Sequence, residues 1–320
     1  MELKEEFITR SRELLGSDAD SYFKTIEEPL NDSFRVNTLK INIEALVNRL
    51  KNKGWELRNV PWCKEGYWVL NGRAALRGKV LGAETPERIG NTLEHFLGYY
   101  YVQEAGSMIP PLMLELKEGQ KVLDMAASPG SKTGQMAGIM NDEGLIIAND
   151  VRIDRVSILK VNMQRIGVRS LLITRRNAMN YQNMKGVFDR ILLDAPCSGE
   201  GVIRSNPYSA VEWNVPTLRK FGKVQKGLIM SAYEALKPGS LMVYSTCSLA
   251  PEEDEEVVNL LLDKTDAILE PARINGLKTR DGITEWQGNS MDKRLKNCAR
   301  IYPQDNDTEG FFVAKVRKPI

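Results

Sequence analysis

KVLDMAASPGSKTGQMA, residues 121–137, has the pattern of a buried strand joined to a helix by a glycine-bearing turn. Gly130 and Gly134 allow the backbone to turn tightly and to approach a ligand, and the start of the helix offers free backbone amides. The turn matches neither GxxxxGKS/T nor GxGxxG, so it does not indicate a phosphate-binding nucleotide fold. The stretch predicts a ligand site of another kind at the end of this strand.

Further along the chain, predicted strands alternate with predicted helices. The helices cover residues 153–166 and lie within 216–236, and the strands are LIIAND at 145, LLIT at 171, FDRILLDA at 188 and SLMVYSTC at 240. Such alternation predicts an α/β fold with a doubly wound, Rossmann-like parallel sheet, whose ligands bind at the carboxyl ends of the strands. CARIYP and GFFVAKV predict a closing antiparallel strand pair at the edge of the sheet. We assign residues 116–320 to this catalytic domain.

The preceding 115 residues have a different character. Apolar spacing predicts two short helices before residue 30 that are separated near Gly16, and a helical pattern also covers residues 99–116. Between them, FRVNTLK, WELRNV and GYWVL predict strands around a helix at 43–53, which together make a small α+β, RRM-like unit. We therefore expect residues 1–115 to be an N-terminal helical and small α+β region.

Aromatic and basic residues are mixed in this small unit. Bases stack on aromatic rings while cations hold phosphates, which suits RNA, but tryptophans in a small domain also commonly form its core. The sequence leaves both interpretations open, and on the first of them residues 1–115 form an RNA-binding region. The residues are Trp55, Trp62, Tyr67 and Trp68 among Arg58, Lys64, Arg73, Arg77 and Lys79.

Charge is unevenly distributed, although the formal net charge is only +2. Residues 30–90 contain 11 Lys/Arg against 6 Asp/Glu, residues 151–180 contain 7 against 1, and residues 203–226 contain 5 against 1. Basic segments beside predicted ligand loops suggest a polyanionic partner, with nucleic acid first, although each segment is also consistent with an ordinary solvated face. The acidic run Glu252–Glu256 follows Pro251, and we expect it to begin a helix rather than bind a metal.

The composition excludes several classes of protein. No run of 18 apolar residues occurs and the N-terminus lacks the layout of a signal peptide, so we expect a cytoplasmic protein with no membrane association. Four cysteines without a CxxC motif predict neither a disulfide framework nor a zinc site. A single histidine, His95, argues against histidine-dependent acid–base or metal chemistry.

Two loops that follow predicted strands contain a cysteine each. Cys197 lies in DAPCSGEG at 194–201, and Cys247 lies in STCS at 245–248. Sequential strands are usually neighbours about 4.8 Å apart, so both cysteines are expected in one crevice. A lone cysteine is more commonly inert and buried, but two at equivalent strand ends favour chemistry. Asp150, at the end of the second strand, is placed to bind a ribose and suggests a single adenosine-type ligand such as S-adenosylmethionine, or it caps the next helix.

From about Phe34 to Lys315 the chain resembles the Sun family of RNA cytosine-5 methyltransferases. The resemblance is to the archaeal and bacterial type without an appended C-terminal domain. DAPCSGEG and the TC pair carry most of its specificity. The matching segments are FRVNTLK at 34, QEAGSMIP at 103, DMAASPGSKT at 124, ND at 149, DAPCSGEG at 194, STCSLAPEEDEE at 245 and RIYPQDNDTEGFFVA at 300.

This resemblance implies roles for individual residues. Cys247 would add to carbon 6 of the target cytosine, Cys197 would resolve the adduct, and Asp194 would hold the base edge. Lys132 would reach into the active site from the cofactor turn. The residues implied in S-adenosylmethionine binding are Ala126, Ser128, Pro129, Gly130, Lys132, Asp150, Arg155, Asn177 and Asp194. The chain departs from the family at Asn177, where an acidic residue is usual, and at Ser128 and Ser131.

We therefore predict an S-adenosylmethionine-dependent RNA cytosine-5 methyltransferase, monomeric and without a metal. A DNA cytosine-5 methyltransferase is the nearest alternative, but that family carries PCQ where this chain has PCSGEG. An RNA-binding or assembly factor that keeps the fold without turnover is the other, and the presence of Cys197, Cys247, Asp194 and Lys132 argues against it. Because the chain ends soon after the catalytic fold, we expect tRNA rather than rRNA as the substrate.

Overall fold

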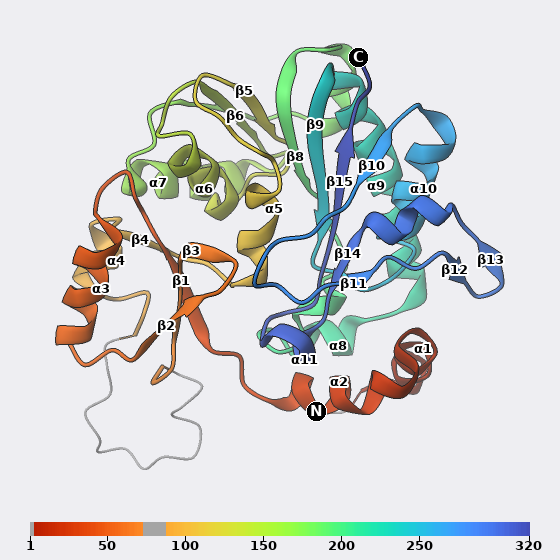
Figure 1. The fold of residues 1–320 in the computed structure, drawn as a ribbon, viewed down its shortest axis with the longest axis horizontal. Coiled ribbons are helices and arrows are strands. Elements are labelled where there is room, and N and C mark those ends of the chain that lie inside the picture. Colours follow the sequence, from red (N-terminus) through yellow and green to blue (C-terminus); the bar gives the residue numbers. More distant parts are fainter. Residues whose placement is uncertain (1–2, 73–87) are drawn as a thin grey trace. The chain divides into compact units, whose positions relative to one another are not determined.

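A computed structural model describes residues 3–72 and 88–320 of the chain (Figure 1). Residues Arg73, Arg77 and Lys79 of the predicted basic cluster lie outside this part. The chain forms two compact units. The first unit comprises Met1–Leu30, Met179–Val187 and Leu193–Ile320, and the second comprises Asn31–Ala178 and Phe188–Leu192.

The two predicted N-terminal helices are confirmed and belong to the first unit. Helix α1 (Glu5–Leu15) ends at Gly16, whose φ of 56° favours glycine, and α2 (Ala19–Glu27) follows after η1 (Gly16–Asp18). Their apolar faces pack into a core cluster with residues much later in the chain. The cluster includes Phe7, Tyr22, Ile26, Ile203, Trp213, Leu218 and Tyr302.

A small α+β domain forms the start of the second unit. Its element order is β1 (Asp32–Val36), α3 (Ile43–Asn52), β2 (Leu57–Val60), β3 (Cys63–Val69), α4 (Leu93–Phe96) and β4 (Tyr100–Val102). The strands form an antiparallel sheet in the order β2-β3-β1-β4, which is the topology of the RRM-like unit that the sequence predicts. The helix predicted over 99–116 is wrong over most of its length, because only residues 106–112 are helical. Tyr100–Val102 instead pairs with β1, and its aromatic and β-branched residues suit a strand.

The tryptophans of this domain are core residues. Trp55, Trp62 and Trp68 are all less than 8% exposed, and Trp55 packs with Phe34 and with Leu50 of α3. Because buried rings offer no face to a nucleobase, base stacking on these three residues is excluded in this structure.

A parallel sheet completes the second unit. Strands β5 (Lys121–Asp124), β6 (Leu145–Asn149), β7 (Leu171–Thr174) and β8 (Phe188–Asp194) lie in the order β8-β5-β6-β7, with α6 (Ser131–Ile139) and α7 (Ile153–Ile166) as the connections. This confirms the predicted α/β alternation. The last two residues of β8 belong to the first unit. The remaining elements here are η2 (Gly106–Met108) and α5 (Ile109–Leu112), and η3 (Ala178–Asn183) begins at the boundary of the units.

Buried polar bonds join the small domain to the parallel sheet within the second unit. Arg35 Nε donates to Gln103 Oε1, and Gln103 Nε2 donates to Gln135 Oε1 on α6. Asn37 Nδ2 donates to the carbonyl oxygen of Ile166, where α7 ends. The small domain is therefore fastened to both helices of this sheet.

The first unit contains the long helix α9 (Val215–Ala235) and an antiparallel array. Strands β11 (Arg280–Asp281), β14 (Ala299–Ile301), β15 (Phe311–Arg317) and β9 (Leu236–Thr246) lie in that order, and β10 (Ile268–Glu270) also pairs with β15. The closing pair is antiparallel as predicted, but β15 lies between β14 and β9 rather than at an edge. The other elements are η4 (Glu200–Val202), α8 (Tyr208–Glu212), α10 (Glu255–Lys264), β12 (Glu285–Trp286), β13 (Asn289–Ser290), η5 (Lys293–Asn297) and α11 (Pro303–Asn306). No helix within the described residues is long and apolar enough to cross a membrane.

Candidate active site

The two cysteines at the strand ends meet in the first unit. The Sγ atoms of Cys197 and Cys247 lie 2.9 Å apart, within hydrogen-bonding distance of one another, and both thiols are free and half-buried. This confirms the expectation that the two loops share one crevice. A pair of adjacent thiols can share one proton, so one can act as a thiolate while the other remains an acid.

Backbone bonds hold the two cysteine loops together. Ala195 N donates to the carbonyl oxygen of Ser245, and Gly201 N donates to that of Cys247. A Cβ atom at Gly201 would lie 2.5 Å from the carbonyl oxygen of Gly310, so this position requires glycine. Asp194 Oδ1 accepts from Ser245 Oγ at 2.7 Å, which orients the carboxylate beside the cysteine pair.

A buried carboxylate that the sequence did not single out supports both loops. Glu253 Oε2 accepts from Ser198 N and from Gln225 Nε2, each at 2.9 Å, and Glu253 Oε1 accepts from Ser248 Oγ at 3.0 Å. Gln225 Nε2 also donates to the carbonyl oxygen of Pro196. One fully buried side chain thus contacts the residue that follows each cysteine.

The acidic run around Glu253 differs from its predicted form. Helix α10 begins only at Glu255, and the carboxylates from Glu252 to Glu255 are buried rather than arranged along a solvated first turn. Arg10 of α1 donates to both oxygens of Glu252, and Arg300 of β14 donates to both oxygens of Glu255. Paired charge-assisted bonds of this kind offset the desolvation of buried carboxylates.

The pKa of the Cys197 thiol is well above its usual value. The hydrogen bond with Cys247 contributes most, followed by burial and by the negative charges of Cys247 and Glu253. Because its pKa is raised, the Cys197 thiol is protonated at neutral pH.

Glu200, in the loop after Cys197, is a buried acid. Trp213 Nε1 donates to Glu200 Oε2 at 2.6 Å, and burial raises the pKa of Glu200 to about 7 from 4.5. Because the folded protein holds this proton more tightly than the unfolded chain, this group makes the protein less stable as the pH rises from about 4.5 to about 7. At 1.36 kcal/mol per pKa unit, the loss is about 3 kcal/mol.

We expect Glu200→Gln to remove this pH dependence. The amide oxygen can still accept from Trp213, so the variant should be within about 1 kcal/mol of the native protein at pH 5 and more stable by about 3 kcal/mol at pH 8. Urea unfolding at both pH values measures the difference, and Glu212→Gln, at an exposed position in the same segment, is the control. Equal stability of the Glu200 variant and the native protein at pH 8 would contradict the raised pKa.

All of the predicted cofactor residues except Asp194, which belongs to the first unit, lie in the second unit. Gly130, before α6, has a φ of 106°, and a Cβ atom there would lie 2.5 Å from Met163 Cε, so the turn requires glycine. Ser128 Oγ donates to the carbonyl oxygen of Arg155, and Arg155 Nη2 donates to that of Ser128. These bonds tie the turn from Ala126 to Gly130, including Pro129, to α7.

Asp150 follows β6 and is 3% exposed. Its Oδ1 accepts from Arg152 N, and its Oδ2 lies 3.2 Å from Arg155 Nε. Asp150 therefore supports the start of α7, and its carboxylate keeps acceptor positions for a ligand because it has about four lone-pair sites. Lys132 Nζ donates to Ser107 Oγ at 2.9 Å, and Asn177 is exposed in the loop after β7.

In residues 3–72 and 88–320, no group of three or more His, Cys, Asp or Glu side chains is placed to hold a metal ion.

Family models match nearly the whole chain. One described as 16S rRNA methyltransferase RsmB/F matches residues 111–317, and one described as the N-terminal domain of 16S rRNA methyltransferase RsmF matches residues 3–105. The chain is 42% identical to the tRNA (cytosine(49)-C(5))-methyltransferase of Pyrococcus abyssi, with 100% of each chain covered. It is 39% identical to ribosomal RNA small subunit methyltransferase F of Vibrio atlanticus, covering 99% of this chain but 64% of that one. The chain thus spans less than two thirds of the length of that relative.

Solved structures agree with these matches. A methyltransferase homolog protein from Pyrococcus horikoshii is 37% identical, with a TM-score of 0.84 and coverage of 98% of this chain and 95% of that one. NSun6 from Pyrococcus horikoshii, solved with the S-adenosylmethionine analogue SFG, is 25% identical, with a TM-score of 0.83 and coverage of 98% of each chain.

Proposed function

Because the chain belongs to the RsmB/F, or Sun, family of RNA cytosine-5 methyltransferases, we propose tRNA as its substrate and S-adenosylmethionine as its methyl donor. The 42% identity over the whole of an archaeal tRNA enzyme supports the choice of tRNA. The solved relative with a cofactor analogue supports the choice of donor. We place the reaction in the cytoplasm and expect a monomer to perform it.

The cysteine pair is the observation that supports a covalent mechanism. Carbon 5 of cytosine is too weak a nucleophile to accept a methyl group unaided. In our proposal, Cys247 Sγ adds to carbon 6, a bond forms between sulfur and carbon, and the electron pair of the ring double bond moves to make carbon 5 an enamine carbon. S-adenosylmethionine supplies the methyl group when it is bound.

Release requires the addition to be reversed. A base removes the proton from carbon 5, the ring double bond re-forms, and the bond between carbon 6 and Cys247 breaks with the electron pair returning to sulfur. We assign the proton removal to Cys197, whose Sγ lies 2.9 Å from that of Cys247. Asp194, oriented by Ser245, holds the base edge and assists protonation at ring nitrogen 3, and Lys132 acts from the cofactor turn.

The residues of the second unit fit the cofactor. The positive φ of Gly130 turns the chain so that the first amides of α6 are free for a ligand, and the buried Asp150 carboxylate can accept from ribose hydroxyls. We propose that Ala126, Ser128 and Pro129 line this cofactor site, that Arg155 holds Asp150 in place, and that the Asn177 carbonyl accepts from the adenine amino group.

The substrate proposal predicts a choice between two RNA classes. With methyl-labelled S-adenosylmethionine, the protein should form 5-methylcytidine in unmodified total tRNA at least about tenfold faster than in small-subunit rRNA, as judged by nucleoside mass spectrometry.

Asp150→Ala should raise the cofactor concentration that gives half-maximal rate about tenfold, since a hydrogen bond to a charged group is lost.

A control variant and two contradicting outcomes accompany these measurements. Asp154→Ala removes an exposed carboxylate four residues away and should leave the cofactor dependence unchanged. Faster methylation of rRNA than of tRNA would contradict the substrate proposal, and an Asp150 variant with normal cofactor dependence would contradict the ribose assignment.

A further inference from the structure

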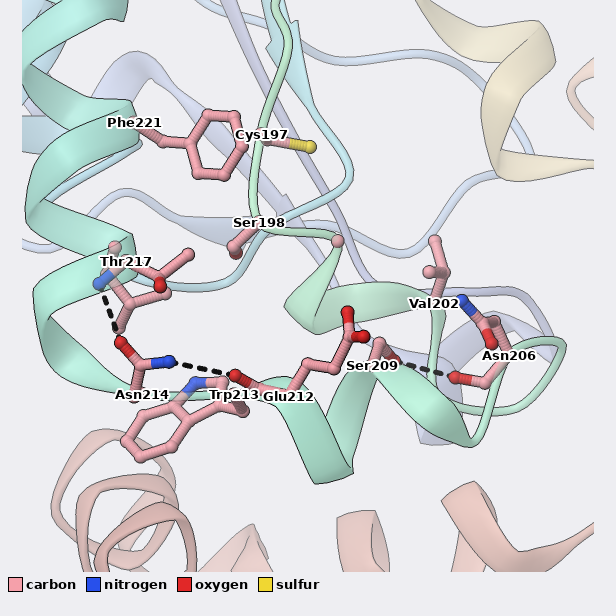
Figure 2. A pocket seen from close by; sticks show the side chains of 12 residues that line it. Cys197, Ser198, Val202, Asn206, Ser209, Glu212, Trp213, Asn214, Thr217 and Phe221 are labelled. Atoms are coloured by element: carbon pink, nitrogen blue, oxygen red, sulfur yellow. Dashed lines mark hydrogen bonds between the residues drawn. The ribbon is translucent and has the colours of Figure 1, made fainter.

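A pocket of about 290 Å³ opens beside Cys197 in the first unit (Figure 2). In Figure 2 the Phe221 ring lies next to Cys197, with Thr217 and Asn214 from the start of α9 on one side and Val202 and Asn206 on the other. Its volume is near the lower end of small-molecule sites, about 300 Å³, which suits one nucleoside rather than a folded element of RNA. The remaining lining residues are Ser198, Gly199, Ser209, Glu212, Trp213 and Leu218.

The target cytosine does not occupy this pocket. Its carbon 6 must contact Cys247, and its edge must contact Asp194. In the described part of the chain neither of these residues lines the pocket, whereas Cys197, the partner thiol, does. The pocket therefore adjoins the reacting base and is open to a group attached to it, which in RNA is the neighbouring nucleotide.

We propose that this pocket binds the base of a nucleotide adjacent to the target cytosine, and this inference rests on the proposed RNA methyltransferase function. Target bases are flipped out of their stack before modification, and a flipped base separates from its neighbour. A pocket that takes the neighbour stabilises the opened strand. Sequence or structure next to the cytosine would then affect methylation.

The side chains of the pocket favour a base over a phosphate. Among the lining residues that the structure describes, Glu212 carries the formal charge, and its carboxylate repels phosphate but accepts from a base amino group. The phosphates of a bound RNA have other partners nearby. Arg219, Lys220 and Lys223 are exposed on α9 and do not line the pocket. Cations that hold the phosphates beside an aromatic side chain that stacks on a base are the arrangement of single-strand binding sites.

Specific contacts are available inside. Phe221 is half-exposed, and aromatic rings stack on any base. Within the described residues, the Asn206 side-chain amide and the Thr217 hydroxyl make no hydrogen bond, so both can bond to a base edge. Together with Glu212, these two side chains favour a base that has an exocyclic amino group. Adenine, cytosine and guanine have one, and uracil does not.

The test uses synthetic tRNA in which the nucleotide on the 5′ or the 3′ side of the methylated cytosine is abasic. For the native protein, one of the two abasic substrates should show a kcat/KM about tenfold lower than intact RNA, in line with the loss of one stacked base. Phe221→Ala should lower kcat/KM on intact RNA by about the same factor and be insensitive to the abasic site. The native protein should methylate the cytosine more slowly when the neighbouring base is uracil than when it is adenine, and Glu212→Gln should reduce that preference.

Controls separate this proposal from a general loss of RNA contact. Tyr208→Ala removes a ring that is 76% exposed on α8 and outside the pocket, and this variant should keep the full abasic penalty. Asn206→Ala serves as a second pocket variant, and circular dichroism establishes that each variant is folded. Equilibrium binding of the same RNAs without cofactor is measured in parallel.

The outcomes are distinct. An abasic penalty that persists in both Phe221→Ala and Asn206→Ala overturns the pocket assignment, as does the absence of a penalty on either side. If the native protein methylates no RNA, the proposed function fails. The pocket assignment is then tested by RNA binding alone. It is supported if the loss of affinity caused by the abasic site disappears in Phe221→Ala and Asn206→Ala, and it is overturned if that loss persists in both.

Discussion

Replacing Cys247 with alanine should abolish methyl transfer and covalent capture of RNA together. Thiolate addition at carbon 6 is the step that makes carbon 5 reactive, and alanine has no lone pair to add. By comparison with other enzymes that lose their nucleophile, we expect the rate to fall by at least about 10⁴-fold. With RNA containing 5-azacytidine, the native protein should form an adduct that survives a denaturing gel, and Cys247→Ala should form none.

The loss of activity in Cys247→Ala should come from the missing nucleophile and not from a change in the fold. Cys247 is half-buried, so its truncation leaves little new cavity. Cys298→Ala is the matched control, because Cys298 is a fully buried cysteine of the same unit and burial raises the pKa of its thiol, which keeps it protonated. This variant should lose about 1 kcal/mol of stability and still form the adduct. An adduct that survives Cys247→Ala but not Cys197→Ala would reverse the two roles.

Local patterns in the sequence were sufficient to predict most elements of the fold. Helix α7 has the predicted bounds, Ile153–Ile166, because Gly167 adopts the left-handed conformation that ends a helix and the preceding residues keep helical spacing. The small sheet and the parallel strands likewise followed from alternation and turns. Strand β4 was mistaken for a helix because only its pairing with β1, far away in the sequence, makes Tyr100–Val102 a strand.

The candidate site was predicted only in part, because some of its contacts join residues that are far apart in the sequence. Adjacent strand ends were enough to bring Cys197 and Cys247 together. The role of Glu253 in positioning both loops was missed, because a run of five acidic residues is usually a solvated face. The acidic run is buried together with two arginines that are distant in the sequence. Arg10 pairs with Glu252, 242 residues away, and Arg300 pairs with Glu255, 45 residues away. Two serines, each directly after a cysteine, were the available signal that a nearby acceptor was needed.

The same pairing explains how Cys197 could change its role during the reaction. The hydrogen bond with Cys247 is the largest contribution that raises the pKa of Cys197. Once Cys247 is bonded to carbon 6, its sulfur has no negative charge and accepts hydrogen bonds only weakly. The pKa of Cys197 should then fall, so the thiol can lose its proton to solvent, and the resulting thiolate can accept the proton from carbon 5.

Cys197→Ala should therefore trap the RNA on the protein. Attack by Cys247 and methylation do not need the second thiol, but proton removal does, and losing a general base costs about 10²- to 10⁴-fold. With natural RNA and cofactor, a covalent complex should accumulate on a denaturing gel while turnover falls by that factor, and the trapped RNA should carry the methyl group. The double variant with Cys247→Ala should show no complex, which assigns the bond to Cys247. Normal turnover by Cys197→Ala, or a loss of turnover without a trapped complex, would mean that another group removes the proton or that Cys197 acts before the bond to carbon 6 forms.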